Sequence, residues 1–333
     1  MKKFLSVVLA MILALGLLAG CAKTENKTTE PTAAPTEATE TTGTTEEAAT
    51  EEAAATEETA ATEEATEEAA EEATEETAAA DSDWAYIKEK GTLVVGMTLF
   101  APMNYYDAEN NFVGFDTELA MAVGKKLGVN VEFIEIDWSA KEIELNSKNI
   151  DVIWNGMCIT EERKANMSVT NPYLINTQAM VMKADKAEAL LANVDGAAVV
   201  AESGSTGEGK LQGTIEDDET VEVSAKEYFA NANYTAVDSM AKAIMEVKSG
   251  LADIALVDSV CALGMVTPES DYADLVVNLD NNFGLQYYGI AFRQGSDVTA
   301  MVNQAIAELT EEGVVAEIAA KYGLTEALVT AAE

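Results

Sequence analysis

The stretch VVAESGSTGEGKLQG, residues 199–213, joins a short apolar run to a glycine-rich turn and a helix. Strand and helix signals alternate on both sides of it. Runs typical of strands are TLVVGM (92–97), NVEFIEID (130–137), IDVIWNG (150–156) and DIALVD (253–258), and runs typical of helices are FDTELAMAVGKKLG (115–128) and VDSMAKAIMEVKSG (237–250). This βαβ rhythm predicts an α/β fold with mostly parallel sheets.

The glycine-rich turn itself fits two kinds of anion. From Gly204 to Lys210 it follows the phosphate-loop pattern, but Leu211 stands where that pattern needs a Ser or Thr hydroxyl for magnesium. Ser205, Thr206 and the amides at the start of the helix would suit phosphate or carboxylate equally well. An ordinary glycine-rich turn is the third interpretation.

The N-terminus predicts export. Residues 1–20 carry two lysines and an apolar run, as a signal peptide does, and they lead into LAGC (18–21), which resembles the bacterial lipobox. In that class Cys21 is acylated, and we expect the protein to be anchored by lipid on the outer face of the cell membrane. The alternative is a plain cleaved signal with a chance cysteine.

Residues 21–80 are rich in Thr, Glu and Ala and have almost no large apolar side chains. Such a segment cannot bury enough surface to offset its ordering entropy. We expect a disordered, self-repelling stalk, which is either a tether or low-complexity filler.

Composition excludes several classes of function. The net charge is −39, and the chain is acidic outside the stalk too, which argues against nucleic-acid binding. The chain has no histidine, so Ser-His-Asp and Cys-His nucleophiles and His-based metal sites are excluded. Beyond Cys21 the chain has Cys158 and Cys261, which could pair, but one bridge makes no disulfide framework.

The segment NGMCITEER, residues 155–163, offers a cationic group at a strand end. A buried strand is expected to end at Asn155-Gly156, and Thr160 can cap the following helix. Arg163 on its first turn would suit a bidentate grip on a carboxylate. The alternative is a surface arginine paired with a neighbouring glutamate.

Other strand ends carry an acidic residue and two aromatics. Asp258 ends the run DIALVD and is either a helix cap or the partner of a cation, magnesium or ammonium. Phe100 and Trp138 could enclose an apolar ligand stem, although aromatics at strand ends are more often core. The segment 107–118 resembles a calcium loop but has Phe112 where the sharp turn needs glycine, so a hairpin turn is expected and no metal site.

Taken together, these segments resemble the bacterial extracellular solute-binding proteins of family 3, the polar amino acid-binding proteins of ABC importers. The resemblance spans about residues 84–323. Its segments are LVVGMTLFAPMNYYDAENNFVGFD, IDWSAKEIELNSKNIDVIWNGMCITEERKANMSVTNPYL, DGAAVVAESGSTGEGKL, SGLADIALVDS and LQYYGIAFRQGSD.

The resemblance implies a periplasmic-binding-protein-like fold of type II. Two α/β lobes would be joined by two crossover strands, near NTQAMVMK (176–183) and LQYYGIAF (285–292), with the ligand in the cleft. Lobe 1 would comprise residues 81–179 plus 287–333, and lobe 2 residues 180–286.

The resemblance also implies roles at the site. Arg163 would take the α-carboxylate of an amino acid, and Asp258 its α-ammonium. The residues assigned to the ligand are Phe100, Trp138, Asn155, Gly156, Cys158, Arg163, Ser205, Thr206 and Asp258. Ser205 and Thr206 at the helix start would help Arg163 to bind the carboxylate. The carbonyl of Gly156 and the residue at 158 would help Asp258 to bind the ammonium, and the two aromatics would hold the stem of the ligand.

Three positions bear on specificity. Cys158 stands where family members usually carry Ser or Thr, and a thiol is a weak hydrogen-bonding group. Met97 stands where many binders of amides or cations carry Asp, while Glu202 could accept a cationic or amide side chain. These indications conflict, and we expect a neutral or polar ligand side chain.

The expected function is therefore capture of a free amino acid and its delivery to the permease subunits of an ABC transporter. We expect a monomer that needs no cofactor and is not an enzyme. The alternatives are a dehydratase-like enzyme on the same fold with Glu202 as its acid, a nucleotide hydrolase, and a surface adhesin that uses the stalk.

Overall fold

The computed structural model describes residues 82–217, 220–281 and 283–329. The predicted signal peptide, the lipidation site Cys21 and the predicted stalk lie outside these residues. Within the described part, no helix is both long and apolar enough to cross a membrane.

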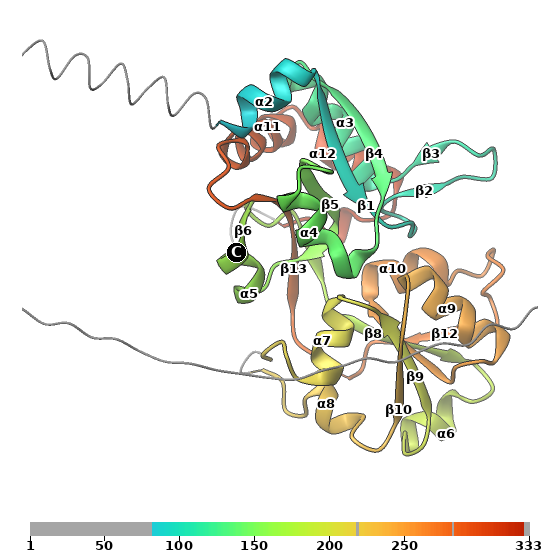
Figure 1. Ribbon diagram of the computed structural model, residues 1–333. Helices are drawn as coiled ribbons and strands as arrows, with labels where there is room; N and C mark the ends of the chain where they lie inside the picture. Colours follow the sequence, from blue (N-terminus) through green and yellow to red (C-terminus); the bar gives the residue numbers. More distant parts are fainter. Residues whose placement is uncertain (1–81, 218–219, 282, 330–333) are drawn as a thin grey trace, which may run out of the picture. The chain divides into compact units, whose positions relative to one another are not determined.

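Two sheets organise the described chain (Figure 1). The first has the strand order β4-β1-β5-β13-β6, with β7 pairing to β13. Its strands are β1 (Thr92–Met97), β4 (Asn130–Glu135), β5 (Val152–Cys158), β6 (Met167–Val169), β7 (Leu174–Asn176) and β13 (Gln286–Arg293). Its helices are α2 (Asp83–Lys90), α3 (Phe115–Leu127), α4 (Lys141–Asn146), α5 (Glu161–Asn166), α11 (Val298–Glu311) and α12 (Val314–Lys321), with the 3-10 turns η1 (Trp138–Ala140) and η2 (Thr325–Ala327).

The second sheet has the order β10-β9-β11-β8-β12. Its strands are β8 (Gln178–Lys183), β9 (Ala198–Glu202), β10 (Asn233–Val237), β11 (Ile254–Asp258) and β12 (Leu275–Asn278). Its helices are α6 (Ala187–Ala192), α7 (Thr206–Gln212), α8 (Ala225–Tyr228), α9 (Met240–Ser249) and α10 (Ser259–Met265). We call the first sheet with its helices lobe 1 and the second with its helices lobe 2.

The expectation of mostly parallel sheets was wrong, because both sheets are mixed. In lobe 1, β1 runs parallel to β4 and β5, whereas β13 runs antiparallel to β5, β6 and β7. In lobe 2, β9 runs parallel to β10 and β11, whereas β8 runs antiparallel to β11 and β12. The chain passes from the first sheet to the second through β8 and returns through β13. These two crossover strands therefore run opposite to the strands of the βαβ units. The predicted lobe boundaries at 179/180 and 286/287 stay predictions.

Strand β5 also departs from expectation, since it continues beyond Asn155-Gly156 to Cys158. Antiparallel pairing of Cys158 with Tyr288 of β13 extends it. Gly156 has a φ of 56°, and a Cβ there would meet the ring of Tyr288 at 2.9 Å and that of Phe100 at 3.0 Å. Only glycine fits this left-handed, crowded position without strain.

Helix α9 forms because its apolar residues recur with helical spacing. It buries Met240, Ala243, Ile244 and Val247 against β8, β9 and β11. It ends, as predicted, at Gly250, whose N–H reaches the carbonyls of the last turn. Figure 1 shows it beside the strands of lobe 2.

The segment that resembles a calcium loop is a hairpin, as predicted. It joins β2 (Tyr105–Tyr106) to β3 (Phe112–Val113). Asp107 Oδ1 accepts hydrogen bonds from the amides of Glu109, at 3.0 Å, and Asn111, at 2.7 Å. The carboxylate therefore closes the turn.

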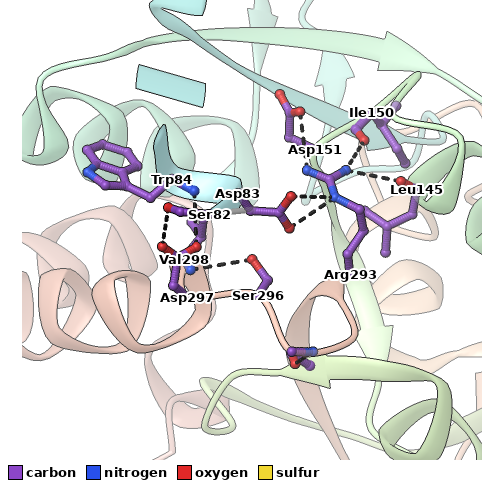
Figure 2. A network of polar contacts seen from close by, with 12 residues as sticks. Ser82, Asp83, Trp84, Leu145, Ile150, Asp151, Arg293, Ser296, Asp297 and Val298 are labelled. Carbon is purple, nitrogen blue, oxygen red and sulfur yellow. Dashed lines mark hydrogen bonds and ion pairs between the residues drawn. The ribbon is translucent and has the colours of Figure 1, made fainter. Parts of the chain in front are cut away.

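Lobe 1 is held at one end by the buried guanidinium of Arg293 (Figure 2). Its Nε donates to both carboxylate oxygens of Asp83, at 2.9 and 3.0 Å, and its Nη1 donates to the carbonyls of Leu145 and Ile150. Oδ1 of Asp151 lies 3.7 Å from Nη2 of Arg293. The network ties α2, α4 and the segment just before β5 to the last residue of β13, so it joins the first and last parts of the lobe.

Arg293→Ala should therefore destabilise the fold by about 3 kcal/mol, because it leaves the buried carboxylate of Asp83 without its cationic partner. The midpoint of urea unfolding measures this loss. Lys164→Ala is the matched control, since Lys164 makes an exposed ion pair with Glu161 and such pairs contribute little. Equal midpoints for the two variants would contradict the assigned role of Arg293.

Candidate functional site

One cavity brings together every residue that the sequence assigns to a ligand. Its lining consists of Phe100, Trp138, Asn155, Gly156, Cys158, Arg163, Ser205, Thr206 and Asp258, together with Glu202 and Met240. The lining comes from both lobes. Lobe 1 contributes residues of β5, η1 and α5 and the loop after β1, and lobe 2 the ends of β9 and β11 and the starts of α7 and α9.

Arg163 is buried and points into the gap between the lobes. Its Nη1 donates to the carbonyl of Cys158 at 2.7 Å and to Thr206 Oγ1 at 3.4 Å, and its Nη2 donates to the carbonyl of Gly204 at 3.1 Å. Among the described residues its partners are carbonyl and hydroxyl oxygens, whereas Glu161 pairs with Lys164. The alternative of a surface arginine paired with a nearby glutamate is therefore wrong. The helix start itself was predicted correctly, because Thr160 Oγ1 caps α5.

The glycine-rich turn is the N-terminus of α7. Ser205 is the cap residue, and its Oγ accepts a hydrogen bond from the amide of Glu208 at 3.1 Å. Lys210, the residue that a phosphate loop would aim at a nucleotide, is buried and paired with Asp217 instead. The geometry therefore gives no support to a nucleotide hydrolase.

Asp258 is a buried carboxylate at the end of β11. Oδ2 accepts a hydrogen bond from the Tyr288 hydroxyl at 2.7 Å, and Oδ1 accepts one from Gln178 Nε2. Burial raises the pKa of Asp258, and these hydrogen bonds oppose that rise. Its side chain makes no capping hydrogen bond to α10. The carboxylate is therefore held for a contact within the cavity rather than for the helix.

Cys158 lies beside that carboxylate, with its Sγ 3.8 Å from Asp258 Oδ2 and 3.4 Å from Gln286 Oε1. Burial, and after it the charge of Asp258, raises the pKa of the thiol well above its usual range. The thiol stays protonated at neutral pH and is a weak contact. Cys158 and Cys261 are both free, so the two thiols do not pair.

Asp116 is a positioning residue that the sequence analysis missed. The carboxylate is fully buried and accepts hydrogen bonds from the amide of Gly156 at 2.7 Å, from Trp154 Nε1 at 3.2 Å and from the Tyr173 hydroxyl at 3.0 Å. Burial raises its pKa to about 7. It fixes the left-handed backbone of Gly156 on the cavity wall.

Asn155 lines the cavity, but its side chain is fully used. Oδ1 accepts from the amide and the hydroxyl of Thr98, both at 2.9 Å, and Nδ2 donates to Thr98 O and to Asn104 Oδ1. An amide has four such positions, and all are filled. Asn155 therefore ties β1 to β5 and has no side-chain hydrogen bond left for a ligand.

Lys141 is a second missed residue, three positions after Trp138. Its buried ammonium donates to the carbonyls of Trp138, at 3.1 Å, and Gly204, at 3.0 Å, and lies 5.1 Å from the Trp138 ring centroid. Burial, followed by the charge of Arg163, lowers its pKa to about 8. Lys141 thus joins the lobes at the same carbonyl as Arg163. Nothing in its polar helical context distinguishes it from a surface lysine.

Comparison with known proteins identifies the family. Residues 93–325 match the family described as bacterial extracellular solute-binding proteins, family 3. The arginine-binding extracellular protein ArtP of Bacillus subtilis (strain 168) is 27% identical over 255 residues, which cover 76% of this chain and 94% of ArtP. The L-cystine-binding protein TcyJ of Escherichia coli (strain K12) is 29% identical over 240 residues, which cover 71% of this chain and 84% of TcyJ.

Solved structures show the same fold. A substrate-binding protein of an ABC uptake transporter from Streptococcus pneumoniae, with bound histidine, superposes with a TM-score of 0.65 at 25% identity, and the match covers 75% of this chain and 100% of that one. This confirms the predicted fold of two α/β lobes of the type II periplasmic binding proteins. By its family match and its fold, the chain belongs to the bacterial extracellular solute-binding proteins of family 3.

Proposed function

We propose that the protein binds a free L-amino acid between its lobes and delivers it to the permease of an ABC transporter. The observation that carries the proposal is a pair of opposite charges lining one cavity, Arg163 from lobe 1 and Asp258 from lobe 2. A zwitterion matches this pair, because its carboxylate meets the guanidinium and its ammonium meets the aspartate. Relatives named for arginine and cystine binding support the class of ligand.

The remaining lining residues take the roles that the resemblance implies. Ser205 and Thr206 assist the arginine, and the carbonyl of Gly156 assists the aspartate. Phe100 and Trp138 enclose the stem of the ligand. We assign a neutral or polar side chain to that ligand, and a carrier rather than an enzymatic role to the protein.

Capture is coupled to closure of the lobes. Because each lobe supplies half of the charge pair, the amino acid binds the closed arrangement better than an open one and shifts the equilibrium towards it. A permease would recognise the closed arrangement. Acylation of Cys21 would keep the protein, as a monomer, on the outer face of the cell membrane, near that permease.

Arg163→Ala should lose about 2–5 kcal/mol of binding free energy, because the ligand carboxylate would be buried without its partner. Titration calorimetry against the twenty amino acids measures the loss, and Lys164→Ala serves as the neighbouring exposed control. Unchanged affinity of Arg163→Ala for the amino acid that the wild type binds would refute the proposed function.

Gly204→Ala tests closure. A Cβ at Gly204, where φ is 72°, would meet Ser139 Cα of lobe 1 at 2.8 Å, so alanine should hold the lobes apart and weaken binding at least about tenfold. Gly91→Ala is a matched control, since its φ is 73° and a Cβ there meets nothing within 4 Å. Both variants carry about 1 kcal/mol of left-handed strain. Equal amino-acid affinities for the two would show that this approach of the lobes is not needed.

A further inference from the structure

Glu202 is a buried carboxyl group in the cavity that the roles above do not use. It ends β9, next to Asp258 at the end of β11. Its side chain is 1% exposed, and its Oε1 has no hydrogen-bond partner among the described residues. A buried polar atom without a partner is costly, so a group that satisfies it binds favourably.

The other charged groups around the cavity already have partners within the protein. Asp258 accepts from Tyr288 and Gln178, and Lys141 donates to two carbonyls. Arg163 is assigned to the ligand carboxylate. This leaves Glu202, which lines the cavity together with the apolar Met240, as the polar group available to the ligand side chain.

The charges that face Glu202 favour its neutral form. Burial, and after it the charge of Asp258, raises its pKa to about 8, against the opposing effects of Lys141, Thr98 and Arg163. At neutral pH it is therefore mostly a carboxylic acid, with one O–H donor and a carbonyl acceptor. A primary amide presents the complementary acceptor and donor.

A cationic side chain fits less well. It would have to ionise Glu202 and would add a positive charge to a buried site that already holds the cations Lys141 and Arg163. An apolar side chain would leave Oε1 without a partner. A neutral amide avoids both costs.

We propose that Glu202 is the specificity residue of the site and that it binds the side-chain amide of a neutral amino acid such as glutamine. The proposal rests on the proposed function and names its ligand class. Glutamine and methionine have side chains of similar length, so they differ chiefly in the hydrogen bonds that Glu202 would make.

Titration calorimetry with glutamine, methionine and arginine tests the proposal on the wild type and two variants. The wild type should bind glutamine about ten- to hundredfold more tightly than methionine or arginine. Glu202→Leu should lose this preference for glutamine over methionine. Glu202→Gln should keep glutamine affinity within about tenfold, because a carboxamide also donates and accepts. Glu161→Gln, on the exposed face of α5, is the control and should match the wild type.

The pH dependence gives a second readout. Glutamine affinity of the wild type should fall above about pH 8, as the donor proton of Glu202 is lost, whereas that of Glu202→Gln should be flatter. Because the folded pKa is raised from 4.5 to about 8, ligand-free wild type should also lose stability as pH rises between these values. In thermal unfolding, Glu202→Gln should lose less stability over this range.

The outcomes separate this inference from the proposed function. A wild type that binds none of the twenty amino acids would overturn the proposed function. A wild type that binds amino acids but prefers arginine or methionine would overturn the role of Glu202 alone. A preference for glutamine that survives in a folded Glu202→Leu variant would also overturn the role of Glu202. If Glu202→Leu does not fold, loss of glutamine binding in Glu202→Gln would overturn that role instead.

Discussion

A buried guanidinium without a carboxylate partner is the constraint on which the site depends. Arg163 reaches the carbonyls of Cys158 in lobe 1 and Gly204 in lobe 2, and in the described residues no carboxylate pairs with it. Carbonyl dipoles satisfy its N–H groups but do not neutralise its charge. The site therefore favours an anion, and in the proposed function the ligand carboxylate supplies it and joins the lobes.

The contrast with Arg293 shows what separates a structural from a functional arginine in this fold. Arg293 is equally buried but is neutralised by Asp83, with Asp151 nearby, all within lobe 1 (Figure 2). The charge of Arg293 is balanced by carboxylates of its own lobe, so that network needs no ligand for neutrality and stabilises one lobe. The network of Arg163 lacks a negative charge and spans both lobes, which is why we propose that ligand binding is coupled to their approach.

The part of the cavity that we propose for the ligand ammonium is positioned by residues outside the cavity lining. Asp116 holds the amide of Gly156, and Tyr288 and Gln178 hold the carboxylate of Asp258. These hydrogen bonds fix the side chains and backbone in advance, so less conformational entropy is lost when a ligand binds. Glu202 lines the cavity itself, and its Oε1 has no hydrogen-bond partner among the described residues, so we propose that it recognises the part of the ligand that varies among amino acids.

The sequence by itself determined the α/β class, the helix start at Thr160 and most of the cavity residues, because strand periodicity, capping and the family's segments are local signals. It did not predict that the two crossover strands pair antiparallel or that β5 continues to Cys158, since pairing with β13 joins residues about 130 positions apart. Nor could it find Lys141 and Asp116, whose roles come from burial and from partners on other elements. Local patterns fix which residues stand at strand ends, whereas only tertiary packing decides which of their charges are neutralised and which remain for a ligand.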